Sequence, residues 1–440
     1  MSELPAGWAM ATLADLAAVE PRAITDGPFG SNLKSSHYTS SGPRVIRLQN
    51  IGDGVFKDEE AHISEAHYER LRTHSVDAGD LIVASLGTDL PRACLVPTNV
   101  PPAIVKADCI RVRLHQSVNA QYVNFALQRP ELRRMVEAQI HGIGRPRLGM
   151  AGIKALQIPL APPSEQILIV TAIEEHFSRI DAAAKCIADM ASKLSRYWMA
   201  LLHSHLGGTW PLRPLADIAD TQLGKMLSQK SKLGVGAVRY VRNRNVQWGK
   251  VVLDEVAEMD FTEQEREKFL LRNGDVLVCE GGEVGRAAIW RDEITPCCFQ
   301  KALHRVRPHP DLSAEYLVFV LQYLHLTGKL EPFVTGVTIK HLPQEDLRLL
   351  PIPSPPRAVQ DQIVTDLKTG LSRLEHLESD VQMAEAKVRA LRDALLSHAF
   401  SGRLTLRCPN EGPVTDLLDR ISTEREASSK SSSQKKKVSL

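Results

Sequence analysis

The sequence predicts an α+β fold in which two tandem domains of mixed α/β character are joined by two long antiparallel coiled-coil helices and related by an internal pseudo-two-fold repeat. Three observations predict this fold: a block of sequence that recurs at a nearly constant offset, proline clusters that divide each copy, and a heptad pattern of apolar residues behind each cluster. The 440 residues leave room for two or three domains with sizeable cores.

The internal repeat has an offset of 194 or 195 residues. The segment Ala78–Val83 returns as Asn273–Val278, and Tyr122–Gln128 returns as Tyr316–Gln322. An offset that persists across most of both halves indicates a duplication, and two copies at so long a period indicate two related domains rather than a solenoid. We therefore expect two similar domains that meet two similar ligands.

Each copy begins with a mixed segment and is closed by prolines. Apolar residues alternate with Arg111 and Arg113 as in a half-buried strand, and residues 119–139 read as a helix, as do residues 313–330. Proline interrupts both helix and sheet, so each proline cluster marks a domain border. The closing prolines are Pro159, Pro162 and Pro163 in the first copy and Pro351, Pro353, Pro355 and Pro356 in the second.

A heptad seam follows each proline cluster. Because a globular domain lies between the two seams, the helices can run antiparallel and bury their seams against each other; the alternative is that each helix packs on its own domain. We expect Gly207-Gly208 and Gly402 to end these helices as left-handed caps. The seam residues are Ile173, Phe177, Ile180, Ala184, Ile187, Ala191, Leu194, Trp198 and Leu201 in the first helix and Leu367, Leu371, Leu374, Val381, Val388, Leu391 and Leu395 in the second.

The predicted boundaries follow from these patterns. They are 1–160 for the first mixed domain, 161–207 for the central long helix, 208–354 for the second mixed domain, 355–402 for the distal long helix and 403–440 for a polar tail. The tail ends in a serine- and lysine-rich segment, which predicts disorder. A solvated tail is a simpler interpretation than a DNA contact by its lysines.

Composition narrows the function. The formal net charge is only +2, so any charge that binds a ligand must be local. No apolar run is long enough for a membrane span, and no secretion signal is visible at the N-terminus. The seven cysteines form no C-x-x-C pair and are odd in number, which favours reduced thiols and a cytoplasmic location over a zinc ribbon or a disulfide framework.

No catalytic motif is complete. The sequence lacks H-E-x-x-H, G-x-S-x-G, a full phosphate-binding loop and the Asp/Asn-Pro-Pro-aromatic motif of amino-methyltransferases. The 15 histidines show no metal-ligand spacing, and the glycine-rich stretches 234–236 and 282–285 read as turns. The sequence therefore predicts a chain that is not an enzyme and that holds no metal.

Polar side chains gather instead in matching loops of the two copies. Arg, Asn and Gln make bidentate contacts to guanine and adenine, while Lys and Ser mostly hold phosphates. The alternative is that the amides shape turns and the arginines face solvent, but loops that match in position while their side chains differ favour recognition. The candidate DNA-binding residues are Ser31, Asn32, Lys34, Arg47, Gln49, Asn50, Arg145 and Arg147 in the first copy and Gln222, Lys225, Arg242, Asn243, Arg244, Asn245, Lys340 and His341 in the second.

The chain resembles the specificity (S, HsdS-type) subunit of type I restriction-modification systems over nearly its whole length. The Pro-Pro-x-Glu-Gln entry to a heptad helix at residues 162–166, with its counterpart at residues 355–360, is the most specific element of the resemblance. The other elements are Leu4-Pro5-x-Gly7-Trp8, Gly27-Pro28-Phe29-Gly30-Ser31-x-Leu33-Lys34, Gly79-Asp80-Leu81-Ile82, Ile158-Pro159-Leu160 and Leu395-Leu396-x-x-Ala399-Phe400-x-Gly402-x-Leu404.

The resemblance implies two target recognition domains, each of which reads one half of a split, asymmetric site on double-stranded DNA. It implies that the long helices set the distance between the half-sites and dock two modification subunits, which bring S-adenosylmethionine and methylate adenine. Restriction (endonuclease/translocase) subunits would bring chemistry driven by ATP and Mg. The chain itself would bind no cofactor, catalyse nothing and meet no membrane.

Two departures from the family pattern appear in the second copy. Residues 223–227 replace the Gly-Pro-Phe-Gly-Ser loop, and Val359 stands where the first copy has Glu165. The loop difference leaves the half-site contacts of the second domain less defined.

Three other functions stay open. A self-contained methyltransferase-endonuclease needs motifs for which two recognition copies leave no room. The sequence barely distinguishes a type I specificity subunit from the specificity subunit of another multi-subunit restriction class. A coiled-coil structural adaptor would show no salt-dependent affinity for DNA.

Overall fold

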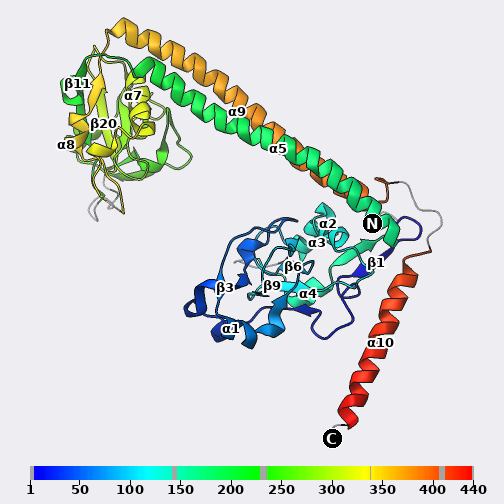
Figure 1. Cartoon of the computed structure of the whole chain (residues 1–440). Coiled ribbons are helices and arrows are strands. Elements are labelled where there is room, and N and C mark those ends of the chain that lie inside the picture. Colours follow the sequence, from blue (N-terminus) through cyan, green and yellow to red (C-terminus); the bar gives the residue numbers. More distant parts are fainter. Residues whose placement is uncertain are drawn as a thin grey trace. The chain divides into compact units, whose positions relative to one another are not determined.

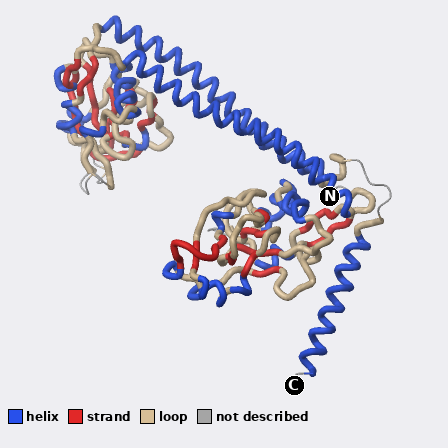
Figure 2. Tube along the Cα trace, in the orientation of Figure 1, coloured by secondary structure: helices blue, strands red, loops and turns tan. Residues whose placement is uncertain are grey.

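The structure is a computed structural model that describes residues 4–140, 146–227, 234, 236–336, 338–405 and 412–438. The chain divides into two compact units: the first comprises Met1–Cys186 and Ala384–Leu440, and the second comprises Ile187–Met383. Each unit therefore contains one mixed domain and a part of each of two long helices (Figures 1 and 2).

The first unit contains three small sheets. Strand β1 pairs with β10, while the other strands form two four-stranded sheets in the orders β2-β9-β6-β7 and β4-β3-β8-β5. The strands are β1 Ala9–Thr12, β2 Ile24–Thr25, β3 Tyr38–Ile46, β4 His62–Ile63, β5 Ser75–Val76, β6 Leu81–Ala84, β7 Ala93–Leu95, β8 Ala103–Val105, β9 Cys109–Val112 and β10 Gln157–Leu160. The helices of the domain are α1 Glu65–Arg70, α2 Ala120–Leu127, α3 Pro130–Gln139 and α4 Met150–Lys154.

The second unit repeats this topology. Strand β11 pairs with β21, the order β12-β20-β17-β18 matches β2-β9-β6-β7, and β13 pairs in parallel with β19 as β3 does with β8. The strands are β11 Leu212–Pro214, β12 Ala219–Leu223, β13 Ala237–Val241, β14 Val246–Gln247, β15 Lys250–Val251, β16 Ala257–Asp260, β17 Val276–Cys279, β18 Ala287–Ile289, β19 Cys298–Phe299, β20 Leu303–Pro308 and β21 Pro351–Pro353. The helices are α6 Glu263–Phe269, α7 Ala314–Leu326 and α8 Gln344–Leu349. The predicted pair of related α+β domains is confirmed.

The core of each unit forms around the repeated strand that follows a Gly-Asp turn. All four residues of β6 are buried, as are all four of β17, because both strands lie inside a sheet that is covered on both faces. A continuous apolar run of this length is the pattern expected of such a strand. The helices α2 and α7 pack most of their length into the same cores.

Two predicted helix boundaries were wrong. The helix expected over residues 119–139 is two helices, because Pro130 begins α3 and cannot continue the hydrogen-bond ladder of α2. Its counterpart α7 carries no proline and runs unbroken, but it ends at Leu326 rather than at residue 330.

The two long helices are α5, Pro163–Leu206, and α9, Arg357–Ala399. In the first unit Arg392 of α9 forms an ion pair of 2.8 Å with Asp181 of α5. In the second unit His205, near the end of α5, lies 3.7 Å from Asp366, near the start of α9. The two helices therefore run antiparallel and side by side within each unit (Figure 1), as predicted.

The heptad seam falls on the less exposed face of both helices. Leu391 is the exception, since it is 58% exposed, so its assignment to the seam was wrong. Ile173 and Phe177 belong to the core of the first domain as well as to the seam. The buried or half-buried seam residues are Ile173, Phe177, Ile180, Ala184, Ile187, Ala191, Leu194, Trp198, Leu201, Leu367, Leu371, Leu374, Val381, Val388 and Leu395.

The glycines that follow the long helices differ from each other. Gly402 has a φ of +68° and is the predicted left-handed cap. Gly207 and Gly208 do not have this conformation, so that prediction was wrong for the first helix. A Cβ on Gly207 would lie 2.5 Å from the carbonyl oxygen of His203, so the absence of a side chain matters there because of close packing.

The polar tail contains a helix where disorder was expected. Helix α10 spans Thr415–Val438, and Val414, Leu417 and Ile421 at its start are buried in the core of the first unit. Their spacing of three and four residues places them on one face, a signal that the polar composition concealed. Arg425 adds hydrogen bonds to backbone carbonyls at residues 14–17, and Glu424 lies 3.2 Å from His115.

The docking of α10 leads to a stability prediction. Ile421→Ala should lower the free energy of unfolding of the first unit by about 2 kcal/mol, because it empties a fully buried site. Amide exchange along residues 415–428 should accelerate as the helix loosens. Arg420→Ala, one residue away and exposed, is the control and should leave exchange unchanged. Equal exchange in both variants would show that the apolar face does not hold α10.

Candidate nucleic-acid interface

A short turn follows the parallel strand in each unit and contains several of the predicted residues. In the first unit it is η3, Leu48–Asn50, and in the second it is η7, Asn243–Asn245. The side chain of Asn50 accepts a hydrogen bond from the backbone of Arg47 and donates to the carbonyls of residues 57 and 59, each at 2.8 Å. Asn245 makes the equivalent bonds with Arg242, Val252 and Glu255.

These two asparagines are therefore structural. Asn50 and Asn245 are buried, and their amide groups are used within the turn, so neither can contact a base without breaking it. Their burial contradicts the prediction that they contact DNA. What they do is hold the preceding residues, Arg47 and Gln49 or Arg242 and Arg244, on the surface of the turn.

A second loop lies beside the turn in the first unit. It runs from Lys106 to Asp108, after β8, and the backbone of Lys106 donates to the carbonyl of Ile46 at 2.8 Å. Asp26 supports the loop, since one of its oxygens accepts from the backbone of Gly27 at 2.7 Å and of Asp108 at 3.0 Å. Burial raises the pKa of Asp26 above its ordinary value.

The turn and this loop enclose a surface hollow. Two predicted residues, Arg47 and Gln49, line it together with Lys106, Asp108 and the ring of Tyr38. The Lys106 ammonium lies 5.7 Å from the centre of that ring. The hollow offers two cations, an aromatic edge and the Gln49 amide, which already donates to Glu59, beside the carboxylate of Asp108. Cations and amides of this kind can hold a phosphate and present donors to a base.

The segment at the end of the first domain reaches the same loop. Arg147 is exposed and forms an ion pair of 2.7 Å with Asp108. Its neighbour Arg145 lies outside the described residues. Ser31, Asn32 and Lys34 are exposed around the short helix η1, Gly30–Asn32, where the backbone carbonyl of Asn32 pairs with His67 at 2.9 Å.

In the second unit, predicted residues from two segments meet at Gly281. The Asn243 side chain donates to the Gly281 carbonyl at 2.6 Å and accepts from Arg286 at 3.1 Å. His341 forms a backbone bridge with Gly281, and its imidazole would lie 3.2 Å from a Cβ placed there. Gly281, directly before the stretch 282–285 that the sequence predicts to be a turn, thus brings Asn243 and His341 together.

The remaining predicted residues of the second unit have internal partners. Lys225 is paired with Glu265 at 2.6 Å and also donates to the carbonyl of Asp260, so its ammonium is committed to the fold. Arg244 and Arg242 share one carboxylate, Glu255, at 2.5 and 3.7 Å. Lys340 pairs with Glu331 at 2.8 Å, and the half-buried Gln222 donates to the carbonyl of Leu223.

The sequence did not single out the loop of Lys106–Asp108 or its counterpart Gln300–Ala302. The backbone of Gln300 donates to Val241 at 3.0 Å, as that of Lys106 does to Ile46. The position of the loop could have indicated its role, because in both copies it directly precedes the repeated strand that contains Arg111 or Arg305.

Gly27 and Gly224 explain how the second copy does without the Gly-Pro-Phe-Gly-Ser loop of the first copy. A Cβ on Gly27 would lie 2.1 Å from the carbonyl carbon of Lys106, and one on Gly224 would lie 2.3 Å from the carbonyl oxygen of Gln300. Gly224 therefore occupies the place of Gly27 although the Gly-Pro-Phe-Gly-Ser sequence is absent. The other departure is also structural, since Glu165 accepts a hydrogen bond from the Trp8 indole at 3.0 Å.

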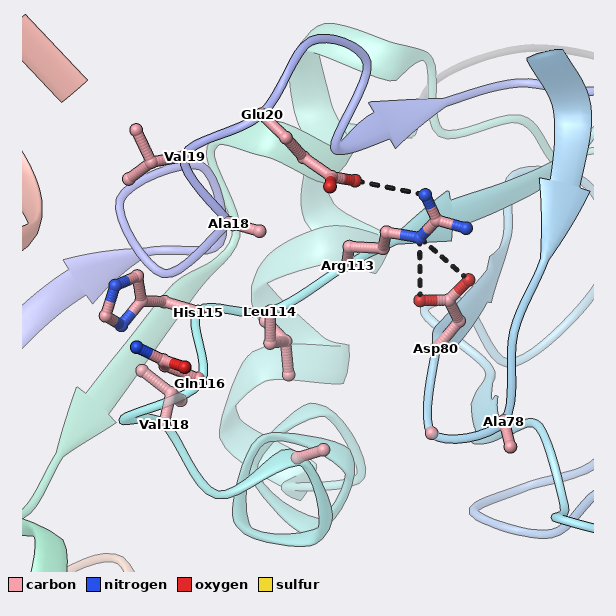
Figure 3. A pocket seen from close by; sticks show the side chains of 12 residues that line it. Ala18, Val19, Glu20, Ala78, Asp80, Arg113, Leu114, His115, Gln116 and Val118 are labelled. Carbon is pink, nitrogen blue, oxygen red and sulfur yellow. Dashed lines mark hydrogen bonds and ion pairs between the residues drawn. The ribbon is translucent and has the colours of Figure 1, made fainter. Parts of the chain in front are cut away.

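The hollow shown in Figure 3 is a different kind of site. Its cation, Arg113, is held by Glu20 at 3.1 Å and by Asp80 at 3.3 Å, and burial raises the pKa of Asp80. Arg307 and Asp275 form the corresponding pair in the second unit. Because both arginines are paired inside the fold, we interpret this network as structural.

Across the described part of the chain, no three or more His, Cys, Asp or Glu side chains are grouped so as to hold a metal ion. None of the described helices has the length and apolar character that crossing a membrane requires.

Comparison with known proteins finds similar chains. Residues 208–380 match the type I restriction modification DNA specificity domain. The chain is 22% identical to the type I restriction enzyme EcoBI specificity subunit of Escherichia coli, over 76% of this chain and 78% of that one. It is 21% identical to the EcoKI specificity subunit of Escherichia coli strain K12, over 99% of both chains.

The solved structures agree on the fold. A chain from a study of complex assembly and conformational transition of the type I R-M system has a TM-score of 0.71 at 18% identity, covering 92% of this chain and all of that chain. The HsdS subunit from Thermoanaerobacter tengcongensis has a TM-score of 0.51 at 18% identity, covering 91% of this chain and 98% of that chain. The repeat and the antiparallel helices agree with these relatives, and the chain is similar to the specificity subunits of type I restriction-modification systems.

Proposed function

We propose that this chain binds double-stranded DNA and reads a bipartite, asymmetric site, with one half-site recognised by each unit. The observation that carries the proposal is the repeated scaffold whose exposed side chains differ in part: the same turn presents Arg47 and Gln49 in one unit and Arg242 and Arg244 in the other, so the first position is shared and the second is not. One geometry with two sets of donors is suited to reading two different sequences.

The chain is proposed to act without catalysing a reaction. Two modification subunits would supply S-adenosylmethionine and methylate adenine, and restriction subunits would supply chemistry driven by ATP and Mg. Large apolar side chains that stay exposed along the long helices support docking of such partners. These side chains are Ile167, Leu168, Met190, Tyr197 and Met199 on α5 and Leu377, Met383 and Leu391 on α9.

The test is to co-express the chain with the modification subunit encoded beside it and to map methylated adenines on the host DNA by long-read sequencing. A split, asymmetric motif with a fixed gap, absent when this chain is omitted, is the expected result. A stable complex that adds no methylation would contradict the proposed function.

Salt dependence separates this function from that of a structural adaptor. If three phosphates are neutralised in each unit, the logarithm of the DNA association constant should fall with the logarithm of salt concentration with a slope of about −5. Titration of the purified complex with a labelled duplex between low and physiological salt measures the slope. A slope near zero would favour the adaptor.

A further inference from the structure

One pair of positions has the same backbone in both units and different chemistry. In the first unit the backbone of Leu148 donates to the carbonyl of Ser85 at 2.8 Å, and the backbone of Ser85 donates to the carbonyl of Asp108 at 2.9 Å. These two bonds place Arg147, the residue before Leu148, directly beside Asp108.

The second unit repeats this arrangement bond for bond. The backbone of Leu342 donates to the carbonyl of Glu280 at 2.7 Å, and the backbone of Glu280 donates to the carbonyl of Ala302 at 2.9 Å. His341, the residue before Leu342, therefore stands where Arg147 stands in the first unit, and Ala302 stands where Asp108 stands.

The backbone at the second position of each pair is unusual. Asp108 has a φ of +69° and Ala302 a φ of +82°, in the left-handed region that residues other than glycine rarely adopt. Strained residues of this kind gather at functional sites, where the surrounding structure holds them. Both units keep the strained backbone while aspartate in one is replaced by alanine in the other.

The side chains give the pair its chemistry. Arg147 donates to Asp108 at 2.7 Å, and the hydroxyl of Ser85 donates to the same carboxylate oxygen at 3.2 Å. Arg147 remains 54% exposed, so the carboxylate orients the guanidinium while other N–H groups stay accessible. A guanidinium oriented in this way donates bidentately to O6 and N7 of guanine.

The second unit cannot make the same contact. Ala302 offers no carboxylate, and the exposed imidazole of His341 has two ring nitrogens in place of a forked set of donors. Its position depends on Gly281, because a Cβ there would lie 3.2 Å from its Nδ1. The two units therefore present different recognition groups from one backbone position.

Resting on the proposed function, we propose that Arg147, oriented by Asp108, recognises a guanine in the half-site of the first unit, and that His341 beside Ala302 determines the corresponding base in the other half-site. Arg147 is the specificity-determining residue and Asp108 is its positioning residue. The alternative role for Arg147, a phosphate contact, is an outcome of the test.

The experiment uses the full chain with its modification subunit and maps the methylated motif for each variant. Arg147→Lys keeps the charge but loses the bidentate fork, so the preference for guanine at one position should fall by about 10- to 100-fold while the gap and the other half-site stay unchanged. Asp108→Asn should relax the same position more weakly. Arg134→Lys, at an exposed arginine on α3, is the control and should leave the motif intact.

The exchange of both residues gives the positive test. Ala302→Asp combined with His341→Arg should introduce a guanine preference into the half-site of the second unit. An unchanged motif for Arg147→Lys, or weaker methylation at all sites without loss of base preference, would overturn the proposal and assign Arg147 to solvent or to phosphate. The wild-type motif is the reference: its absence would mean that the proposed function itself has failed, and this inference with it.

Discussion

Gly27→Ala should abolish recognition by the first unit while the second half of the motif is retained. The new Cβ would lie 2.1 Å from the carbonyl carbon of Lys106 and 2.5 Å from the carbonyl oxygen of Val105, and backbone atoms cannot rotate away as a side chain can. The loop of Lys106–Asp108 must shift, at a cost of about 1–3 kcal/mol. Because this loop borders the hollow and holds Arg147, the contacts to one half-site move with it.

The repeat provides a mirror experiment. A Cβ on Gly224 would lie 2.3 Å from the carbonyl oxygen of Gln300, so Gly224→Ala should affect only the other half-site. Gly149→Ala is the matched control, since its Cβ would meet nothing within 4 Å. The measurement is the methylated motif, with the thermal unfolding of each variant as a check on folding. An intact motif in Gly27→Ala would show that the loop does not contribute to recognition.

Arg307→Met should destabilise the second unit by about 3–5 kcal/mol, because it leaves a buried carboxylate without its charge partner. The Asp275 side chain is only 1% exposed, and its two oxygens accept from Arg307 at 2.7 and 2.8 Å. Denaturant unfolding of the wild type and the variant measures the difference. A loss below about 1 kcal/mol, the range of exposed ion pairs, would contradict this interpretation.

The equivalent change in the first unit, Arg113→Met, should lower the free energy of unfolding by less, and the loss should depend on pH. Arg113 lies 3.3 Å from both oxygens of Asp80, a longer contact than in the second unit, and burial already raises the pKa of Asp80. A raised folded-state pKa means that Asp80 favours the fold most at low pH, and that this contribution is lost as pH rises through the raised value. Arg113→Met should therefore be least stable near neutral pH and recover as the solution is acidified.

The sequence alone determined the repeat, the buried strands and the seam of the long helices. These features depend only on the spacing of residues along the chain, which the sequence gives directly. Tyr122 and Tyr316, which are 194 residues apart, lie in the equivalent helices α2 and α7 and are buried in equivalent cores. The same spacing located the polar loops, because each loop begins where a predicted strand ends.

The tertiary structure decided which polar residues are available. Asn50 and Asn245 had the chemistry of base contacts, but the loops that fold over them supply carbonyl acceptors and bury them. The sequence did not predict the left-handed backbone of Asp108 and Ala302. At a residue other than glycine this conformation is imposed by segments that are distant in the chain. Helix α10 likewise packs three apolar residues into the core of the first unit, which is formed mostly by residues of the first domain. Composition and periodicity are local properties, whereas burial, pairing and strain depend on which distant segments meet.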